Sequence, residues 1–353
     1  MRRIQSTPPV LAFAACVVLA ANCGVRATAA DHNPRVVPMR DAKLVREFEC
    51  LVFDLGKGVE LQLVKVSAKG RSFRIGSSPQ EQDTLVQQHF AGKRPGSLDC
   101  ENARELTLTD DFYLGRFEVT RGQFGRFVED TGYVTDTERT DGGYGWNDAL
   151  QKFEGRDRKY DWRNTGIAAQ GDQHPVTNIT QSDARKFCDW LRKRADGRVP
   201  VREVRLPGEA EWEFACRAGS QGRFSFGDDD ERLAEFANVA DGTAREKFPD
   251  WNGIQRKDGH AFMAPVGQFR PNDFGLYDMH GNVWEFCEGY YGRYSALPKA
   301  GNALQTVLQG ESRPIMRGGA YYTGPTACRA ANRYVVGLGG RYASGGFRVL
   351  CLP

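Results

Sequence analysis

Helical spacing of apolar residues is confined to three short stretches of this chain. The first begins at Thr120, which is placed to form a capping box with Gln123. Phe124 and Phe127 follow at the spacing that puts both on one helix face. The pattern stops at residues 131–132, Thr-Gly, and this predicts a helix of about three turns.

A second helix is predicted after Thr180, with Asp183 at its third position. Residues 192–194 are all basic, and cations are favoured near a helix C-terminus. The apolar positions of this helix follow the i, i+3, i+4, i+7 pattern: Ala184, Phe187, Cys188 and Leu191.

The third helix is predicted to be short and to begin after Pro207, burying Trp212 and Cys216. Alternation of apolar and polar residues over 60–75 predicts a β-hairpin. A few helices among many short strands indicate an α+β fold.

Three longer stretches carry little regular pattern. Residues 79–105 are polar and predict a loop insertion, and residues 134–173 predict a long irregular surface loop. Residues 221–270 are also irregular, and backbone of that length usually needs something to hold it.

The N-terminus is typical of a secretory signal. Residues 1–30 begin with two arginines, continue with an apolar run over 10–21 that is too short to span a membrane stably, and end on a small-residue cleavage pattern at 27–29. A lipoprotein anchor at Cys23 fits less well because Asn22 precedes it, and a retained anchor is the other alternative. We expect an N-terminal extension over 31–59, one domain over 60–353 and a periplasmic or secreted protein with no membrane span after cleavage.

Removal of the predicted signal changes the net charge of the chain. The formal charge of the 353-residue chain is +3, from 48 basic and 45 acidic residues. Residues 1–30 contain three arginines and no acid, so the mature chain carries equal numbers of both. The basic excess is an export feature, and nucleic acid is not an expected partner.

The most distinctive stretch is residues 272–286, NDFGLYDMHGNVWEF. Gly275 and Gly281 allow tight turns or close backbone approach. Asp278, Asn282 and Glu285 supply hard oxygen atoms, the ligands that suit Ca²⁺. A surface turn rich in Asp and Asn is the plainer alternative for this spacing. The five histidines show no metal-ligand spacing.

This stretch resembles the signature of the formylglycine-generating-enzyme domain, also called the sulfatase-modifying-factor family. Three further blocks resemble the family in the same order: FEVT at 117–120, VRLPGEAEWEFA at 204–215, and RGGAY at 317–321 with GFR at 346–348. The resemblance covers roughly residues 60–352. It implies the family's α+β, C-type-lectin-like fold, and it implies that loops such as 134–173 wall a substrate groove.

The resemblance also implies two structural calcium sites. The first matches Asn238, the carbonyl of Val239, Asp258 and the carbonyl of His260. The second matches Asp278, the carbonyls of Gly281 and Val283, and Glu285.

The resemblance is weaker at the positions where the family's enzymes bind copper. The family's enzymes bind Cu(I) through two cysteines five residues apart and use O₂ to oxidise a cysteine of a client sulfatase. Here the second cysteine position is Cys328, but the first is Thr323, which is a poor ligand for a soft metal. Ala320 replaces the usual serine and Ser344 the usual asparagine. The groove residues implied by the resemblance are Tyr321, Tyr322, Thr323, Arg329 and Ser344.

Seven cysteines follow the signal, an odd number, so at least one does not pair within the chain. Relatives pair cysteines at the positions of Cys287 and Cys328, and the pair here is open to three readings: a disulfide, a redox-active or copper-binding pair, or two buried thiols. The resemblance also implies a Cys188–Cys351 bridge.

Two classes of function follow. The first is an exported O₂-dependent oxidoreductase that matures a protein, peptide or siderophore-type substrate, with Cys328 and Cys287 as candidate catalytic residues. Pyoverdine-maturation members of the family give this class its periplasmic precedent. The second is a non-catalytic, calcium-stabilised, lectin-like binding module. The replacements at Thr323 and Ala320 argue against typical copper-dependent formylglycine generation.

Overall fold

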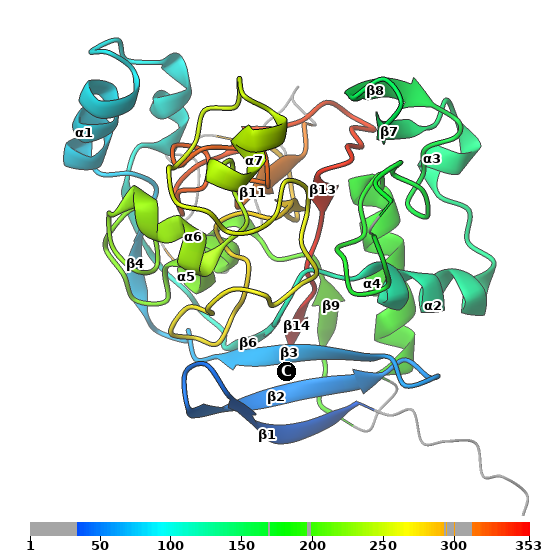
Figure 1. Cartoon of the computed structure of the whole chain (residues 1–353). Coiled ribbons are helices and arrows are strands. Elements are labelled where there is room, and N and C mark those ends of the chain that lie inside the picture. Colours follow the sequence, from blue (N-terminus) through cyan, green and yellow to red (C-terminus); the bar gives the residue numbers. More distant parts are fainter. Residues whose placement is uncertain (1–33, 169, 196–198, 293, 295–299, 301–312) are drawn as a thin grey trace, which may run out of the picture. The chain divides into compact units, whose positions relative to one another are not determined.

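The computed structural model describes residues 34–168, 170–195, 199–292, 294, 300 and 313–353 (Figure 1). The predicted signal at 1–30 and its cysteines lie outside the described residues. Within the described part of the chain, no helix is long and apolar enough to cross a membrane.

The largest sheet has six strands, and each pairs antiparallel with its neighbours. Its first two strands come from the stretch that the sequence assigns to an N-terminal extension, so this stretch is built into the sheet. Its last strand in sequence, β14, lies between β6 and β9. In spatial order the strands are β1 (Arg35–Asp41), β2 (Arg46–Asp54), β3 (Glu60–Val66), β6 (Phe112–Gly115), β14 (Leu350–Leu352) and β9 (Glu203–Arg205).

The hairpin predicted over 60–75 is wrong. β3 pairs with β2 and β6, whereas β4 (Ser72–Ile75) pairs with β5 (Arg104–Thr107) in a separate two-stranded sheet. An alternating pattern identifies a half-buried strand but does not name its partner, because any antiparallel neighbour satisfies the same alternation.

The polar loop predicted over 79–105 is also wrong. It contains α1 (Pro79–His89) and the 3₁₀ helix η1 (Gly96–Glu101). Ser78 caps α1 by accepting a hydrogen bond from the backbone N–H of Glu81 at 3.1 Å, and proline occupies the first turn. α1 buries only a narrow face, which is why its apolar pattern was too weak to predict it.

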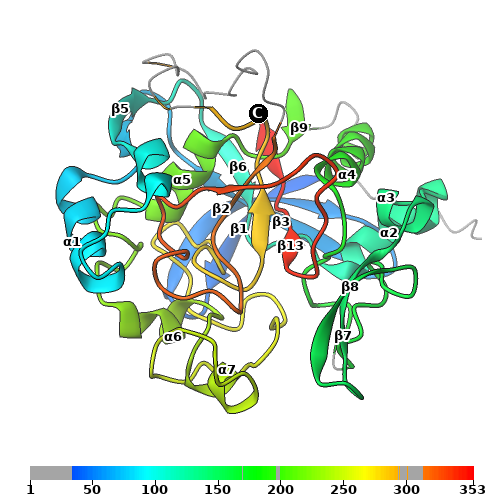
Figure 2. The same ribbon diagram turned by 90° about the horizontal axis from the view of Figure 1, so that it is seen from above.

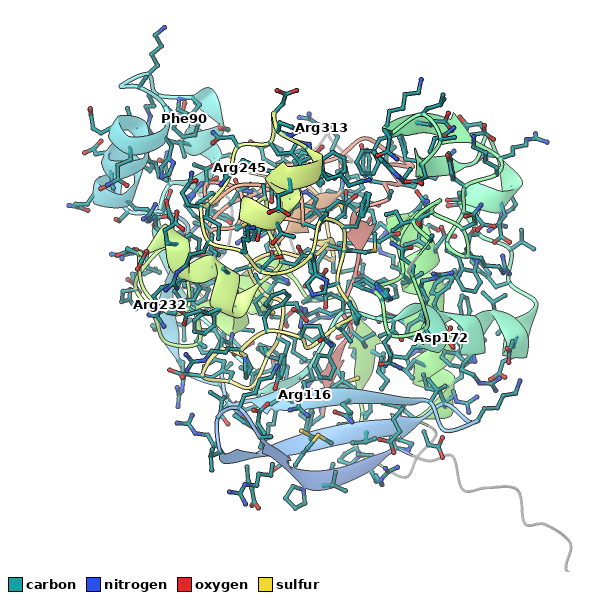
Figure 3. The ribbon with its side chains drawn as sticks, in the orientation of Figure 1. Phe90, Arg116, Asp172, Arg232, Arg245 and Arg313 are labelled. Atoms are coloured by element: carbon teal, nitrogen blue, oxygen red, sulfur yellow. The ribbon has the colours of Figure 1, made fainter. Side chains whose placement is uncertain are left out.

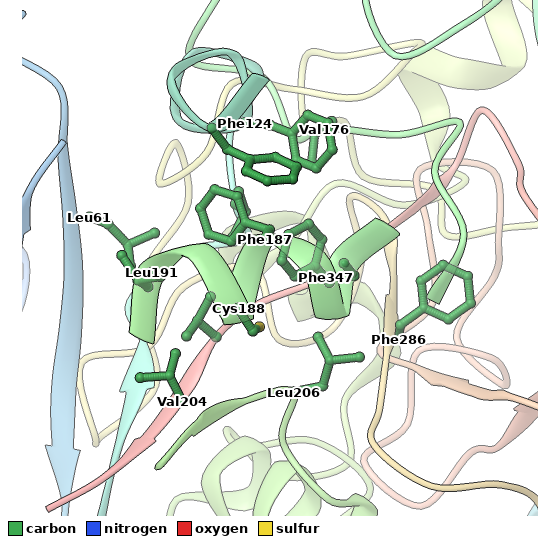
Figure 4. Close-up of a cluster of buried hydrophobic side chains, with 14 of the residues drawn as sticks. Leu61, Phe124, Val176, Phe187, Cys188, Leu191, Val204, Leu206, Phe286 and Phe347 are labelled. Atoms are coloured by element: carbon green, nitrogen blue, oxygen red, sulfur yellow. The ribbon is translucent and has the colours of Figure 1, made fainter. Parts of the chain in front are cut away.

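The three predicted helices are present as α2 (Arg121–Thr131), α4 (Gln181–Arg194) and α5 (Glu209–Arg217). The capping box predicted at Thr120 forms, and Thr180 caps α4 as predicted, also through a capping box with Asp183. α2 and α4 pack through stacked Phe124 and Phe187, whose ring centroids are 6.0 Å apart. Figure 4 shows Phe187, Cys188 and Leu191 of α4 directed into this core.

Three strands of the second sheet overlap the sequence blocks at 272–286, 317–321 and 346–348. In spatial order it contains β12 (Tyr334–Val335), β11 (Ile315–Arg317), β10 (Trp284–Phe286) and β13 (Gly345–Gly346). Seen from above in Figure 2, α1 lies on one side of these strands and α2 and α4 lie on the other.

The stretch 134–173 is more regular than the sequence predicts. It contains α3 (Asp136–Arg139) and a hairpin of β7 (Gly143–Asn147) and β8 (Lys152–Asp157). The hairpin is glycine-rich and only its first strand is largely buried, so alternation is weak. The stretch 221–270 is mostly irregular, as predicted, and contains η2 (Asp230–Arg232), α6 (Leu233–Phe236) and α7 (Gly242–Lys247).

Candidate functional site

The segment that leaves β11 makes a tight turn around a cysteine. Gly318 and Gly319 adopt φ values of 98° and 84°, which side chains rarely allow. A Cβ atom at Gly319 would lie 2.7 Å from Cys328 Sγ and 3.0 Å from Thr323 Oγ1. Glycine is therefore required here both by the backbone conformation and by the close approach of the sulfur atom.

Thr323 organises this turn through its hydroxyl group. Its Oγ1 accepts a hydrogen bond from the backbone N–H of Ala320 at 2.9 Å and donates to the carbonyl of Ala320, also at 2.9 Å. Cys328 Sγ lies 3.3 Å from the same oxygen. The thiol of Cys328 is also within 3.7 Å of the carbonyl of Thr323, so it contacts both polar groups of this residue.

Cys328 is fully buried, in an apolar cluster that includes Phe224, Val239 and Ile254. Burial raises the pKa of its thiol to about 12. The thiolate, which is the form that attacks electrophiles and binds soft metals, is therefore scarce at neutral pH.

His280 supports the backbone next to Cys328. The backbone N–H of Ser225 donates to His280 Nε2 at 3.0 Å, so that nitrogen carries no proton. His280 Nδ1 then donates to the carbonyl of Cys328 at 2.9 Å. Burial lowers the pKa of His280 to about 4, so the ring is neutral at neutral pH and holds this geometry.

An aromatic pocket of about 280 Å³ opens beside the turn. Tyr321, Tyr322 and Ser344 line it, and none of its described lining residues is charged. Cys328 is not among the lining residues. The others, which sequence reasoning did not select for the site, are Tyr144, Phe153, Trp251, Tyr342 and Ala343. Their signal in the sequence was a density of aromatic residues in loops, which alone does not distinguish a pocket from a core.

The arginines near the turn serve the structure. Arg329 is buried and pairs with Glu101 at 2.9 Å and with Glu81 at 3.0 Å. Arg333 pairs with Glu209 at 2.6 Å and is also buried. Carboxylates of α1, η1 and α5 neutralise the positive charges of both arginines. Neither arginine lines the aromatic pocket.

All seven described cysteines are free thiols in the structure. Cys188 and Cys351 belong to the same apolar core. Burial raises the pKa of Cys188 well above its usual range, and the nearby Cys351 sulfur adds to the effect. Cys287 and Cys328 belong to two different apolar clusters. The predicted disulfides stay predictions.

The motif 272–286 forms a mostly buried turn and ends in β10. Asp278 and Asn282 have φ values of 59° and 67°, the left-handed conformation. Glu285, in β10, accepts two hydrogen bonds from Arg348, at 2.6 and 2.5 Å, and one from Trp212 Nε1 at 2.7 Å. Arg116, labelled in Figure 3, lies next to this turn and pairs with Asp41 at 2.6 Å.

A second oxygen-rich group lies in the irregular stretch 221–270. Asp258 accepts hydrogen bonds from the backbone N–H groups of Val239 at 3.0 Å and His260 at 2.8 Å. Burial raises the pKa of Asp258 to about 7, and the negative charge of Asp241 adds to the rise. Asn238 Oδ1 is buried and has no hydrogen-bond partner among the described residues.

The chain belongs to the family defined by the Sulfatase-modifying factor enzyme 1-like domain, whose sequence profile matches residues 66–351. It is similar to the formylglycine-generating enzyme of Mus musculus, with 29% identity over 246 residues that cover 64% of this chain and 61% of the relative. It is also similar to the inactive C-alpha-formylglycine-generating enzyme 2 of Bos taurus, with 30% identity over 285 residues that cover 73% of this chain and 78% of the relative.

Among solved structures, PvdO from Pseudomonas aeruginosa resembles this fold with a TM-score of 0.62 and 25% identity, covering 86% of this chain and 98% of that one. The predicted α+β fold of the family is therefore confirmed. The chain spans less than two thirds of the mouse enzyme, and the relatives include both active and inactive proteins. Family membership is thus settled while catalytic status is open.

Family members bind Ca²⁺ and copper, and the residues present fit these ions unequally. The unpartnered amide oxygen of Asn238 beside Asp258 fits a hard cation. Thr323 and Cys328 would offer copper one hydroxyl group and one thiol, and a hydroxyl group is a hard ligand that does not suit Cu(I).

Proposed function

We propose that this chain is an exported, substrate-binding member of the formylglycine-generating-enzyme family that does not perform copper-dependent oxidation of cysteine. In this proposal the aromatic pocket seats an apolar or aromatic part of an exported protein, peptide or small molecule. The observation that carries the proposal is the hydroxyl of Thr323 at 3.3 Å from the buried Cys328 sulfur.

In this proposal the first of the two copper-binding cysteines of the family's enzymes is missing, because Thr323 occupies its position. A hydroxyl group is a hard ligand and does not select Cu(I). The remaining thiol faces Phe224, Val239 and Ile254 and does not line the pocket. A substrate in the pocket would therefore contact tyrosine and tryptophan rings, with no thiolate within the lining.

The pocket is suited to apolar recognition. Trp251 and Tyr322 have ring centroids 6.0 Å apart, and Tyr144 stacks on Tyr342 at 5.8 Å. Aromatic side chains offer large contact area at low conformational cost. The hydroxyl groups of the lining tyrosines and Ser344 supply the few polar groups that orient a ligand in such pockets.

The first test asks whether copper chemistry occurs. The purified mature protein, given Cu(I), O₂ and a peptide containing Cys-Xaa-Pro-Xaa-Arg, should form no formylglycine by mass spectrometry. Thr323→Cys should gain Cu(I) binding because it restores a second thiol beside Cys328, and Thr323→Ser should not. Conversion of the peptide by the wild-type protein would overturn the proposal and support the oxidase alternative.

The second test asks whether the pocket binds. Saturation-transfer NMR with the same peptide should show contact with the wild-type protein and a loss of signal in Tyr322→Ala. Tyr334→Ala is a matched control, because Tyr334 is 38% exposed and Tyr322 is 37% exposed, but only Tyr322 lines the pocket. Equal loss in both variants would show that the signal does not come from the pocket.

Export and disulfides complete the proposal. We expect residues 1–30 to be removed and Cys188 to bridge to Cys351 in the oxidising compartment, because both lie in one core cluster. Peptide mass spectrometry of the non-reduced mature protein tests both points. The same map shows whether Cys287 is bridged to Cys328, as the relatives' pairing implies, or whether both thiols stay free.

We propose that Ca²⁺ has a structural role at the two oxygen-rich groups. Asn238 and Asp258 would hold one ion and Asp278 would contribute to the other, with backbone carbonyls completing each shell. A bound ion would neutralise buried carboxylates and fix the irregular stretch 221–270 against the motif 272–286.

A further inference from the structure

Three rings of the aromatic pocket meet at steep angles. Tyr321 and Tyr322 are inclined to each other by 75°, with ring centroids 5.5 Å apart. Trp251 is inclined to Tyr321 by 48° and to Tyr322 by 60°. All three rings line the pocket. Walls at such angles surround a rounded group on several sides, whereas a flat ring needs two parallel walls.

The lining also contains two pairs of rings that are close to parallel, but neither pair admits a flat guest. Tyr144 and Tyr342 have centroids 5.8 Å apart at 27°. Phe153 and Trp251 have centroids 6.4 Å apart at 17°. A third ring between two parallel rings needs a separation of about 7 Å, twice the contact distance of two carbon atoms. The pocket therefore favours one compact, rounded group over a stacked aromatic system.

The lining offers ring faces and no charge. Burial raises the pKa of Tyr321 and of Tyr342, so both hydroxyl groups stay protonated at neutral pH. Arg156, whose charge acts on Tyr342, is not among the lining residues and pairs with Asp141 at 3.3 Å. An anion would find no opposite charge among the described lining residues, whereas a cation is attracted by the negative faces of the rings.

The aromatic cluster that includes the pocket already holds one cation of the chain. Phe153, a lining residue, packs edge-to-face against Trp146 with centroids 5.1 Å apart. Lys247 Nζ lies 4.8 Å from the ring centroid of Trp146 and 5.6 Å from that of Phe262. These distances are typical of cation–π contacts. Ring faces of this cluster therefore hold an ammonium group at Trp146, while the pocket presents other rings of the same cluster.

One wall of the pocket is oriented in advance. The Tyr322 hydroxyl accepts a hydrogen bond from Trp284 Nε1 at 3.3 Å. Trp284 lies in β10 and is 4% exposed, so it forms a fixed support. A ring that is already oriented loses little conformational freedom when a ligand binds.

We propose that the aromatic pocket is selective for a quaternary ammonium group, which is a positively charged nitrogen covered by methyl or methylene groups. This inference rests on the proposed function of the pocket as a binding site and names its ligand class. The methyl groups match apolar walls, and the charge is attracted by ring faces without a carboxylate. The group is rounded, and it therefore suits walls that meet at steep angles.

Isothermal titration calorimetry with choline and with neohexyl alcohol, its neutral carbon analogue, tests the proposal. The two probes have the same shape, but a carbon atom replaces the charged nitrogen in the alcohol. Choline should bind to the purified mature protein at least about tenfold more tightly than the alcohol. Equal affinities would overturn the inference and leave the pocket as a purely apolar binding site, in agreement with the proposed function.

Two substitutions of Tyr322 separate attraction by ring faces from apolar contact. Tyr322→Phe keeps the ring and should retain the preference for choline. Tyr322→Leu keeps an apolar side chain without a ring, so it should weaken choline binding at least about threefold and change the affinity for neohexyl alcohol less than about twofold. Tyr322 is 37% exposed, so both variants should fold, which circular dichroism verifies. Equal losses for both probes in Tyr322→Leu would overturn the inference.

A peptide that contains trimethyllysine distinguishes a polypeptide source of the group from a small molecule. Binding of choline supports a small molecule, and binding of the peptide alone supports the same chemistry on a polypeptide. The unmethylated peptide should bind more weakly in either case, because a bare ammonium group is strongly hydrated. If choline and the trimethyllysine peptide both fail to bind, the inference is overturned. The saturation-transfer experiment with the cysteine peptide then decides the proposed function separately.

Discussion

The central motif contributes to two neighbouring groups of buried charges, which differ in how their charges are balanced. One group surrounds Glu285, and the other contains Glu118 and Asp278. Around Glu285 every charged atom has a partner: Arg348 donates to Glu285, Tyr277 and Gly115, and Trp212 donates to Glu285. In the group around Glu118, Oε2 of Glu118 and Oδ1 of Asp278 have no hydrogen-bond partner in the part of the chain that the structure describes. The first group satisfies its own charges, whereas the second leaves two buried carboxylate oxygens without a partner among the described residues. Burial alone therefore does not distinguish a structural ion pair from a ligand site, but the balance of charges and partners does.

The largest effect is expected from breaking the complete group. Arg348→Met should destabilise the protein by about 3–5 kcal/mol, because Glu285 is left charged and buried with only Trp212 as a donor. Urea denaturation followed by tryptophan fluorescence measures this change. The double variant Arg348→Met, Glu285→Gln should recover part of the loss, and a loss below 1 kcal/mol in the single variant would refute the contrast.

Removing the ion from the incomplete group should have the next largest effect. At a free Ca²⁺ concentration about 100 times the Kd, binding to the folded state alone contributes about 2.7 kcal/mol per site. Chelation should therefore lower the midpoint of urea unfolding in the wild-type protein. Asp278→Asn should show a smaller response to chelator than the wild-type protein, and an equal response would contradict the calcium site proposed at Asp278.

A still smaller effect, with the opposite sign, is expected in the absence of the ion. In chelator at neutral pH, Glu118→Gln should be as stable as the wild-type protein or more stable by about 1 kcal/mol, because it keeps the acceptor for Asn282 and removes a buried carboxylate whose other oxygen has no partner among the described residues. Unfolding midpoints in matched chelator buffers measure this. A strong destabilisation would show instead that the charge of Glu118 is stabilised within the folded chain, as the charge of Glu285 is.

The smallest effect is expected where the same kind of ion pair is exposed. Arg35 and Glu60 pair at 2.5 Å, with side chains 49% and 38% exposed. Arg35→Ala should change the free energy of unfolding by less than about 1 kcal/mol, because water and salt screen an exposed pair. A cost similar to that of Arg348→Met would show that burial is not what sets the scale.

Local signals in the sequence predicted local structure well. The capping boxes at Thr120 and Thr180 and their apolar stripes gave α2 and α4, because caps and spacing act within a few residues. The partner of β3 was mispredicted because pairing depends on distant residues. α1 was missed although Ser78 and Pro79 form a recognisable helix start, since the polar composition that follows hides a narrow buried face.

The candidate site was predicted in the same uneven way. Tyr321, Tyr322 and Ser344 do line the pocket, and their block was identified by resemblance. Tyr144, Phe153 and Trp251 were missed because they reach the pocket from separate loops. Glu118 stood inside a quoted block but received no role, because its relation to Asp278 depends on how residues 118 and 278 meet in the folded chain.

The position of β14 has a consequence for how the chain folds. Residues 350–352 lie between β6 and β9, so the six-stranded sheet cannot close until nearly the whole sequence is available. The hairpin of β1 and β2 has the same dependence, since Lys43 bonds to carbonyls more than 220 residues further along. Such long-range pairing makes folding slow and late. A chain of this topology can complete its largest sheet only after its last residues have been synthesised. Truncation before residue 350 should therefore prevent folding altogether, whereas shortening the chain before residue 34 should not.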